Sequence, residues 1–255
     1  MKRLKDWFCS TDEIFDSFKF SCLDYKDKTK RRIFIDRQSD ILFVAHADTV
    51  LTPKILQYTK KRVFAQGLDD RLGCYTACRL SAKYQTDLLI TDGEESGLTT
   101  AKYHDCKSYK WVVEFDRGGE DVVTYGLCND EFLAALSEYW EIGFGSYSDI
   151  VELETDCCCL NLGIGYENAH CKTSFYSKKT YIKQLLLFDQ FFSKYKNTDF
   201  GKHDELLSDN WNNFEECNVC DFCNNGVGEY VHGYYICQNC FDTLAFENTK
   251  NTIIY

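Results

Sequence analysis

The stretch Ile41-Leu-Phe-Val-Ala-His-Ala-Asp48 begins with five apolar residues. A histidine follows them directly, and an aspartate stands two residues further on. A short apolar run without alternation is typical of a strand that is buried on both faces of a sheet. Further strands are expected at 32–36, 87–91, 111–115 and 157–163, and helical spacing of apolar residues is found at 12–20, 73–84, 96–103, 131–140 and 180–195. This alternation predicts an α/β fold with a mostly parallel central sheet flanked by helices.

Acidic and histidine side chains follow these predicted strands. His46 follows the strand at 41–45, Glu94 and Glu95 follow the strand at 87–91, and Asp116 follows the strand at 111–115. His170 comes soon after the strand at 157–163. Because ligands of parallel sheets bind beyond the carboxyl ends of the strands, these residues are expected to meet at one edge of the sheet.

The residue types at this edge suit two divalent metal ions. Zinc accepts histidine nitrogen and carboxylate oxygen, and a carboxylate can bridge two ions about 3.5–4 Å apart. We expect Asp69 to be the bridge. The remaining ligands are expected to be His46 and Asp116 for one metal, and Glu95 and His170 for the other.

Two further carboxylates near these ligands have separate expected roles. Asp48 lies two residues beyond His46 and is expected to accept the ring N–H of His46 and so fix its orientation. Glu94 is expected to face the attacking water as the general base, since its neighbour Glu95 points in another direction. Each signal by itself also fits a surface turn or a packed histidine, and the metal-site interpretation depends on all of them together.

The order of these signals resembles the co-catalytic zinc exopeptidases, a clan that includes aminopeptidases, peptidase T and zinc carboxypeptidases related to acylases. The resemblance covers about residues 35–195 and is carried by five stretches, namely Phe43-Val-Ala-His-Ala-Asp-Thr-Val50, Gly67-Leu-Asp-Asp-Arg-Leu-Gly73, Thr91-Asp-Gly-Glu-Glu-Ser-Gly97, Glu114-Phe-Asp-Arg-Gly-Gly119 and Asn161-Leu-Gly-Ile-Gly-Tyr-Glu-Asn-Ala-His170. It implies the same ligand, base and orienting roles. The spacing leaves no room for the lid domain that many relatives insert, and Ser148-Asp149 is weakly similar to a position near the substrate.

The resemblance implies a dizinc metallohydrolase that cleaves amide or peptide bonds, with an aminopeptidase-like exopeptidase as the first expectation. An N-acyl amino acid deacylase or carboxypeptidase-type hydrolase is one alternative, and a catalytically inactive binding protein with this fold is another. Two Zn²⁺ ions, or Co²⁺ or Mn²⁺, are the expected catalytic cofactors. The expected substrate is a small peptide or an N-acyl amino acid, and no substrate-binding residue is identified from the sequence.

Composition excludes some partners and points to a compartment. The formal net charge of −11 disfavours binding to nucleic acid or to a membrane surface. The sequence has no apolar run long enough to span a bilayer and no signal-like segment at its start, so its 15 cysteines are expected in a reducing cytoplasm. The triplet Cys157-Cys158-Cys159 is expected to pack as small apolar side chains in the core.

The carboxyl-terminal region has the spacing of a structural zinc site. Two Cys-x-x-Cys pairs supply the favoured ligands Cys220, Cys223, Cys237 and Cys240, and Cys217 is an alternative to Cys223. Residues 230–236 are expected to form a hairpin between the two pairs, and the module is expected to bind one structural Zn²⁺ and to contact a protein partner. The predicted organisation is a catalytic domain at 1–195, a polar linker at 196–216 and the cysteine module at 217–255.

Overall fold

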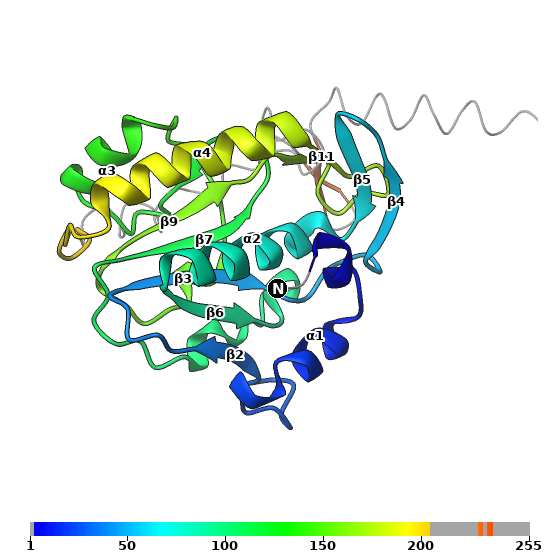
Figure 1. Ribbon diagram of the computed structural model, residues 1–255, viewed down its shortest axis with the longest axis horizontal. Coiled ribbons are helices and arrows are strands. Elements are labelled where there is room, and N and C mark those ends of the chain that lie inside the picture. Colours follow the sequence, from blue (N-terminus) through cyan, green and yellow to red (C-terminus); the bar gives the residue numbers. More distant parts are fainter. Residues whose placement is uncertain (1–2, 205–228, 232–233, 237–255) are drawn as a thin grey trace, which may run out of the picture. The chain divides into compact units, whose positions relative to one another are not determined.

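The computed structural model describes residues 3–204, 229–231 and 234–236 (Figure 1). By compactness the chain divides into one unit from Met1 to Ser208 and a second from Asp209 to Tyr255. In the second unit, β12 (Glu229–Val231) pairs antiparallel with β13 (Tyr234–Ile236), which matches the predicted hairpin strands. The cysteines proposed as structural zinc ligands lie outside the described residues.

The central sheet of the first unit has seven strands in the order β1-β2-β6-β3-β7-β9-β8. Its middle consists of four mutually parallel strands, β6 (Asp87–Thr91), β3 (Ile41–His46), β7 (Trp111–Arg117) and β9 (Cys158–Gly163). The outer strands β1 (Cys22–Leu23), β2 (Arg32–Ile35) and β8 (Val122–Val123) pair antiparallel at the two edges. The predicted α/β class with a mostly parallel central sheet is therefore confirmed.

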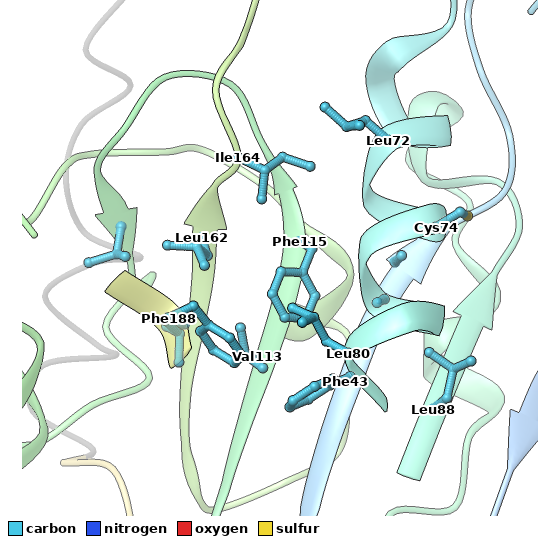
Figure 2. Close-up of a cluster of buried hydrophobic side chains, with 14 of the residues drawn as sticks. Phe43, Leu72, Cys74, Leu80, Leu88, Val113, Phe115, Leu162, Ile164 and Phe188 are labelled. Atoms are coloured by element: carbon cyan, nitrogen blue, oxygen red, sulfur yellow. The ribbon is translucent and has the colours of Figure 1, made fainter. Parts of the chain in front are cut away.

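Helices cover the sheet as the apolar periodicity predicted. The α-helices are α1 (Thr11–Ser17), α2 (Leu68–Tyr84), α3 (Asp130–Ser137) and α4 (Lys178–Tyr195), and α2 packs on β3 and β7. The ring of Phe43 in β3 lies 5.3 Å from that of Phe115 in β7 and 5.6 Å from that of Phe188 in α4 (Figure 2). Edge-to-face contacts of this kind are a favoured arrangement of aromatic rings and stabilise the packing of α4 on the sheet.

Cysteines contribute to the core in the expected way. Cys157, Cys158 and Cys159 are all buried, as predicted for the triplet. Every cysteine within residues 3–204 is a free thiol.

Among the described residues, the helices lack the combination of length and apolar character that a membrane span requires.

A second, four-stranded sheet was not predicted. Its order is β10-β11-β5-β4, formed by β4 (Lys54–Tyr58), β5 (Arg62–Gln66), β10 (Tyr166–Glu167) and β11 (Phe175–Ser177). The sequence of β4 gives no alternating signal because four of its five residues are exposed. This sheet connects the region after the first motif to the segment on either side of His170.

The helix predicted at 96–103 is wrong. The structure has two 3₁₀ turns in this region, η3 (Glu94–Ser96) and η4 (Thr100–Tyr103), and further 3₁₀ turns η1 (Leu4–Trp7), η2 (Lys19–Ser21) and η5 (Asp149–Val151). Gly93 and Gly97 border η3 with positive φ angles of 86° and 67°. These left-handed residues end the turn on both sides and keep the chain from continuing as an α-helix.

Residues 196–204, which the sequence assigned to the linker, lie in the first compact unit. Phe200 is buried and its ring lies 4.8 Å from that of Phe132. The side-chain amide of Asn129 donates hydrogen bonds to the carbonyl oxygens of Phe200 and Lys202. The chain thus packs against the N-terminus of α3 after α4 has ended.

Candidate metal centre

His46 is the last residue of β3 and is fully buried. Parallel pairing places it opposite Thr91 at the end of β6, and β7 runs along its other side. The Nε2 atom of His46 lies 3.0 Å from Asp116 Oδ1 and 3.3 Å from Asp69 Oδ1. The sheet register alone therefore brings the first imidazole to the carboxylate of Asp116, near the end of the neighbouring strand β7.

Asp69 stands at the start of α2, where the backbone is not yet helical. Its two carboxylate oxygens face different imidazoles, with Oδ1 3.3 Å from His46 Nε2 and Oδ2 3.1 Å from His170 Nε2. This is the arrangement expected of a carboxylate that bridges two cations.

Asp70, the next residue, has a structural role that the sequence did not reveal. It is fully buried and accepts hydrogen bonds from the backbone N–H groups of His46, at 3.3 Å, and Gly73, at 2.8 Å. A Cβ atom on Gly73 would lie 2.0 Å from both Asp70 Oδ1 and the carbonyl oxygen of Phe115. The glycine at the end of the Gly67–Gly73 motif is the signal that could have indicated this close packing.

Glu94 and Glu95 form the first turn of η3, directly after β6. Glu95 Oε2 lies 3.0 Å from His170 Nε2, whereas Glu94 Oε2 lies 3.7 Å from His46 Nε2. The two adjacent carboxylates thus lie beside different imidazoles. The second oxygen of Glu95 is buried and has no hydrogen-bond partner among the described residues.

Asp48 holds the loop that carries these glutamates. Its carboxylate accepts hydrogen bonds from the backbone N–H groups of Gly93, Glu94 and Glu95, at 2.8, 3.2 and 3.0 Å. Its Oδ1 also lies 3.3 Å from His46 Nδ1, the contact expected of an orienting carboxylate, although no well-aligned hydrogen bond joins the two. The capping of the glutamate loop is a second role that the sequence did not reveal.

His170 supplies the outermost group of the site. It lies in the loop between β10 and β11, has a positive φ of 58°, and leaves half of its side chain exposed. The five expected ligands are therefore brought together as two groups that share Asp69, one with His46 and Asp116 and the other with Glu95 and His170. Within each group the ligand atoms all lie within 4.8 Å of one another.

The donor set fits divalent metal ions. Four carboxylates and two imidazoles meet in a largely buried space, where uncompensated negative charge is costly. Imidazole nitrogen and carboxylate oxygen are ligands that zinc, cobalt and manganese accept. The buried oxygen of Glu95 without a partner is a further atom that a cation would satisfy.

The pKa values of the site show how strongly these groups interact without a cation. Burial would raise the pKa of Asp69, but hydrogen bonds from His170 and His46 hold it well below its usual range. Hydrogen bonds to Asp69 and Glu95 raise the pKa of His170 to about 10. Burial, reinforced by the charges of Asp149 and Asp69, raises the pKa of Glu94 to about 7, a value suited to proton transfer near neutral pH.

A buried polar cluster adjoins the metal ligands. Ser148 donates a hydrogen bond to Glu114 and accepts one from the amide of Asn161. The side-chain oxygen of Asn161 accepts the backbone N–H of Asp116 at 3.1 Å, and Thr91 donates to Asp149. Ser148 and Asp149 are fully buried, and the Ser148–Asn161 contact joins Glu114 to the backbone of the ligand Asp116.

No family model matches the chain, and no curated protein matches it. Among solved structures, the chain is similar to aminopeptidase PepT from Bacillus cereus, with 13% identity, 74% of this chain and 95% of the other covered, and a TM-score of 0.46. It is also similar to a tripeptidase from Staphylococcus aureus, with 11% identity, coverage of 75% and 97%, and a TM-score of 0.47. An endoglucanase from Thermotoga maritima gives 11% identity, coverage of 77% and 100%, and a TM-score of 0.48.

Proposed function

We propose that this protein is a two-metal hydrolase that cleaves amide bonds, and that it acts as an exopeptidase of the aminopeptidase type. The observation that carries the proposal is the position of Asp69, whose two oxygens face His46 and His170 separately. Such a shared carboxylate has little use in a structural site, which is normally closed around one ion. The choice of an exopeptidase rests on the motif resemblance.

The chain's own groups suffice for the proton transfers of amide hydrolysis. Glu94 lies 3.7 Å from His46 Nε2, farther than Asp69 or Asp116 does, and its pKa, raised to about 7, leaves a substantial fraction of it as a base near pH 7. It accepts a proton from the attacking water and returns it to the amine leaving group. Zinc held by the five ligands would supply Lewis acidity for the carbonyl oxygen and lower the pKa of water.

Glu94→Gln and Glu95→Gln form a matched pair that tests this assignment. The first is expected to keep metal binding and to lower kcat by about 10²–10⁴-fold, the range for a general base. The second is expected to lose affinity for one of the two metals as well. The measurement is turnover of aminoacyl, carboxy-terminal and N-acyl substrates with added zinc, cobalt or manganese, together with metal content.

The outcomes separate the alternatives. Turnover of aminoacyl substrates supports the exopeptidase, whereas turnover only of N-acyl amino acids would replace it with a deacylase. Full turnover in Glu94→Gln would show that the base is misassigned. Two bound metals without turnover of any substrate would favour an inactive protein that binds through this fold.

A further inference from the structure

The amino-terminal segment lies outside the five motifs, yet it contacts the loops that carry the metal ligands. The hydroxyl of Thr11, the first residue of α1, donates to the carbonyl oxygen of Ala47 at 3.1 Å. Ala47 stands between His46 and Asp48. Arg71 of α2 donates to the same carbonyl and also to the carbonyl oxygen of Cys9, at 3.1 Å. The first site loop is therefore joined to the start of α1.

Arg31 forms the corresponding link to the second site loop. Its Nε lies 2.7 Å from Asp92 Oδ2, and its Nη1 lies 2.6 Å from Asp12 Oδ1 in α1. Only 7% of the Arg31 side chain is exposed, and its guanidinium group lies 4.2 Å from the ring centre of Phe15. The planar guanidinium of Arg31 is held in one orientation by two carboxylates and a ring. It therefore fixes the position of Asp92 relative to α1.

Asp92 opens the loop that carries Glu94 and Glu95. Its backbone is paired with Thr100, since its N–H donates to Thr100 Oγ1 at 3.0 Å and its carbonyl oxygen accepts the N–H of Thr100 at 2.8 Å. Asp48 holds the same loop from the inner side through three backbone N–H groups. The carboxylate of Asp92 pairs with Arg31, which in turn pairs with Asp12 in α1.

We propose that Arg31 is a positioning residue, which holds the loop of Glu94 and Glu95 in place by linking Asp92 to α1. The expected effect of Arg31 on turnover rests on the proposed function. Its expected effect on metal affinity can be measured without any substrate. Buried ion pairs contribute little net stability because desolvation offsets their attraction. The pair of Arg31 with Asp92 is therefore better explained by orientation than by stability.

Arg32, the next residue along the chain and the first of β2, provides a control. Its side chain is 9% exposed, pairs with Asp24 at 2.8 Å and donates a hydrogen bond to the carbonyl oxygen of Lys30, and neither of these partners belongs to a loop of the metal site. Arg31→Met and Arg32→Met thus each remove a buried arginine that is paired with a carboxylate, and only Arg31 pairs with the loop of the metal site. A merely structural role predicts similar consequences for both variants.

The experiment measures zinc affinity of the full chain by calorimetry, and kcat and KM with the best substrate of the panel. Arg31→Met is expected to weaken the binding of one of the two metals by about 10–100-fold, the range for residues that orient metal ligands. It is expected to lower kcat by a similar factor with little change in KM. Arg32→Met is expected to leave both metal affinities and kcat within about twofold of wild type.

Unchanged metal affinity in Arg31→Met, or an equal loss in Arg32→Met, would overturn the positioning role. If wild type binds two metals but hydrolyses nothing, the proposed function fails while the affinity comparison still decides the role of Arg31. If Arg31→Met does not fold, Asp12→Asn tests the same link from α1. It is expected to shift affinity in the same direction by a smaller factor, and an unchanged affinity there would refute the link.

Discussion

The two candidate metal-binding groups share Asp69 but differ in how the fold builds them. The buried group contains His46 and Asp116, which lie at the ends of the adjacent parallel strands β3 and β7. The exposed group contains Glu95, in a 3₁₀ turn, and His170, in a loop with half of its side chain in solvent. Sheet pairing fixes the first group, whereas only local turns and side-chain contacts fix the second. We therefore expect the buried group to bind metal more tightly, because its ligands lose less freedom on binding.

The largest effect is expected where the two groups meet. Asp69→Asn removes the negative charge that both groups share and should lower turnover by about 10³-fold or more, since each metal contributes several kcal/mol to transition-state stabilisation. The measurement is kcat/KM together with metal content. Asp105→Asn removes an exposed aspartate of the same unit and should leave both unchanged. Retention of two metals and of activity in Asp69→Asn would show that the groups are independent.

The second prediction compares the two histidines in metal-free protein. His46→Ala leaves Asp116 buried without its imidazole partner and should lower the free energy of unfolding by about 3 kcal/mol. His170→Ala removes a half-exposed partner and should cost less than about 1 kcal/mol. Urea unfolding in the presence of a chelator measures the loss of unfolding free energy in each variant. Equal losses would mean that the groups do not differ in rigidity.

Asp48→Asn should affect the exposed group more than the buried one. Asparagine has one acceptor oxygen where the carboxylate offers two, so the backbone N–H groups of residues 93–95 lose part of their anchor. We expect a 10–100-fold loss of affinity at the group that contains Glu95. Titration with cobalt, followed by its absorption spectrum, resolves the two binding steps. An equal loss at both steps would indicate that Asp48 acts mainly through His46.

The smallest effect is a pH dependence of the metal-free protein. Contacts with Asp69 and Glu95 raise the pKa of His170 to about 10, above the ordinary value of 6.5. A raised histidine pKa stabilises the fold fully below pH 6.5, and this stabilisation is lost as the pH rises toward 10. Because the side chain is half exposed, the contribution should be below about 1 kcal/mol.

His170→Asn is the control for this dependence. The difference in unfolding free energy between wild type and variant should shrink between pH 6 and pH 10 in low salt with chelator. A difference that grows over this interval would contradict the assigned contacts of His170.

The sequence predicted the buried group more completely than its surroundings. The apolar run before His46 and the one before Asp116 read directly as buried parallel strands, and their carboxyl ends had to meet. The strand β4 was missed because its side chains are mostly exposed and follow no period. The hydrogen bond from the His46 backbone to Asp70 and the ion pair of Arg31 with Asp92 join segments far apart in the sequence, and no local pattern encodes such contacts.

The most direct test of the account is the position of metal in a crystal of the zinc-loaded full chain, located by anomalous scattering at the zinc edge. We predict two peaks about 3.5–4 Å apart on either side of the Asp69 carboxylate, one contacting His46 and the other His170. A single peak, or peaks that do not share Asp69, would contradict the two-metal centre.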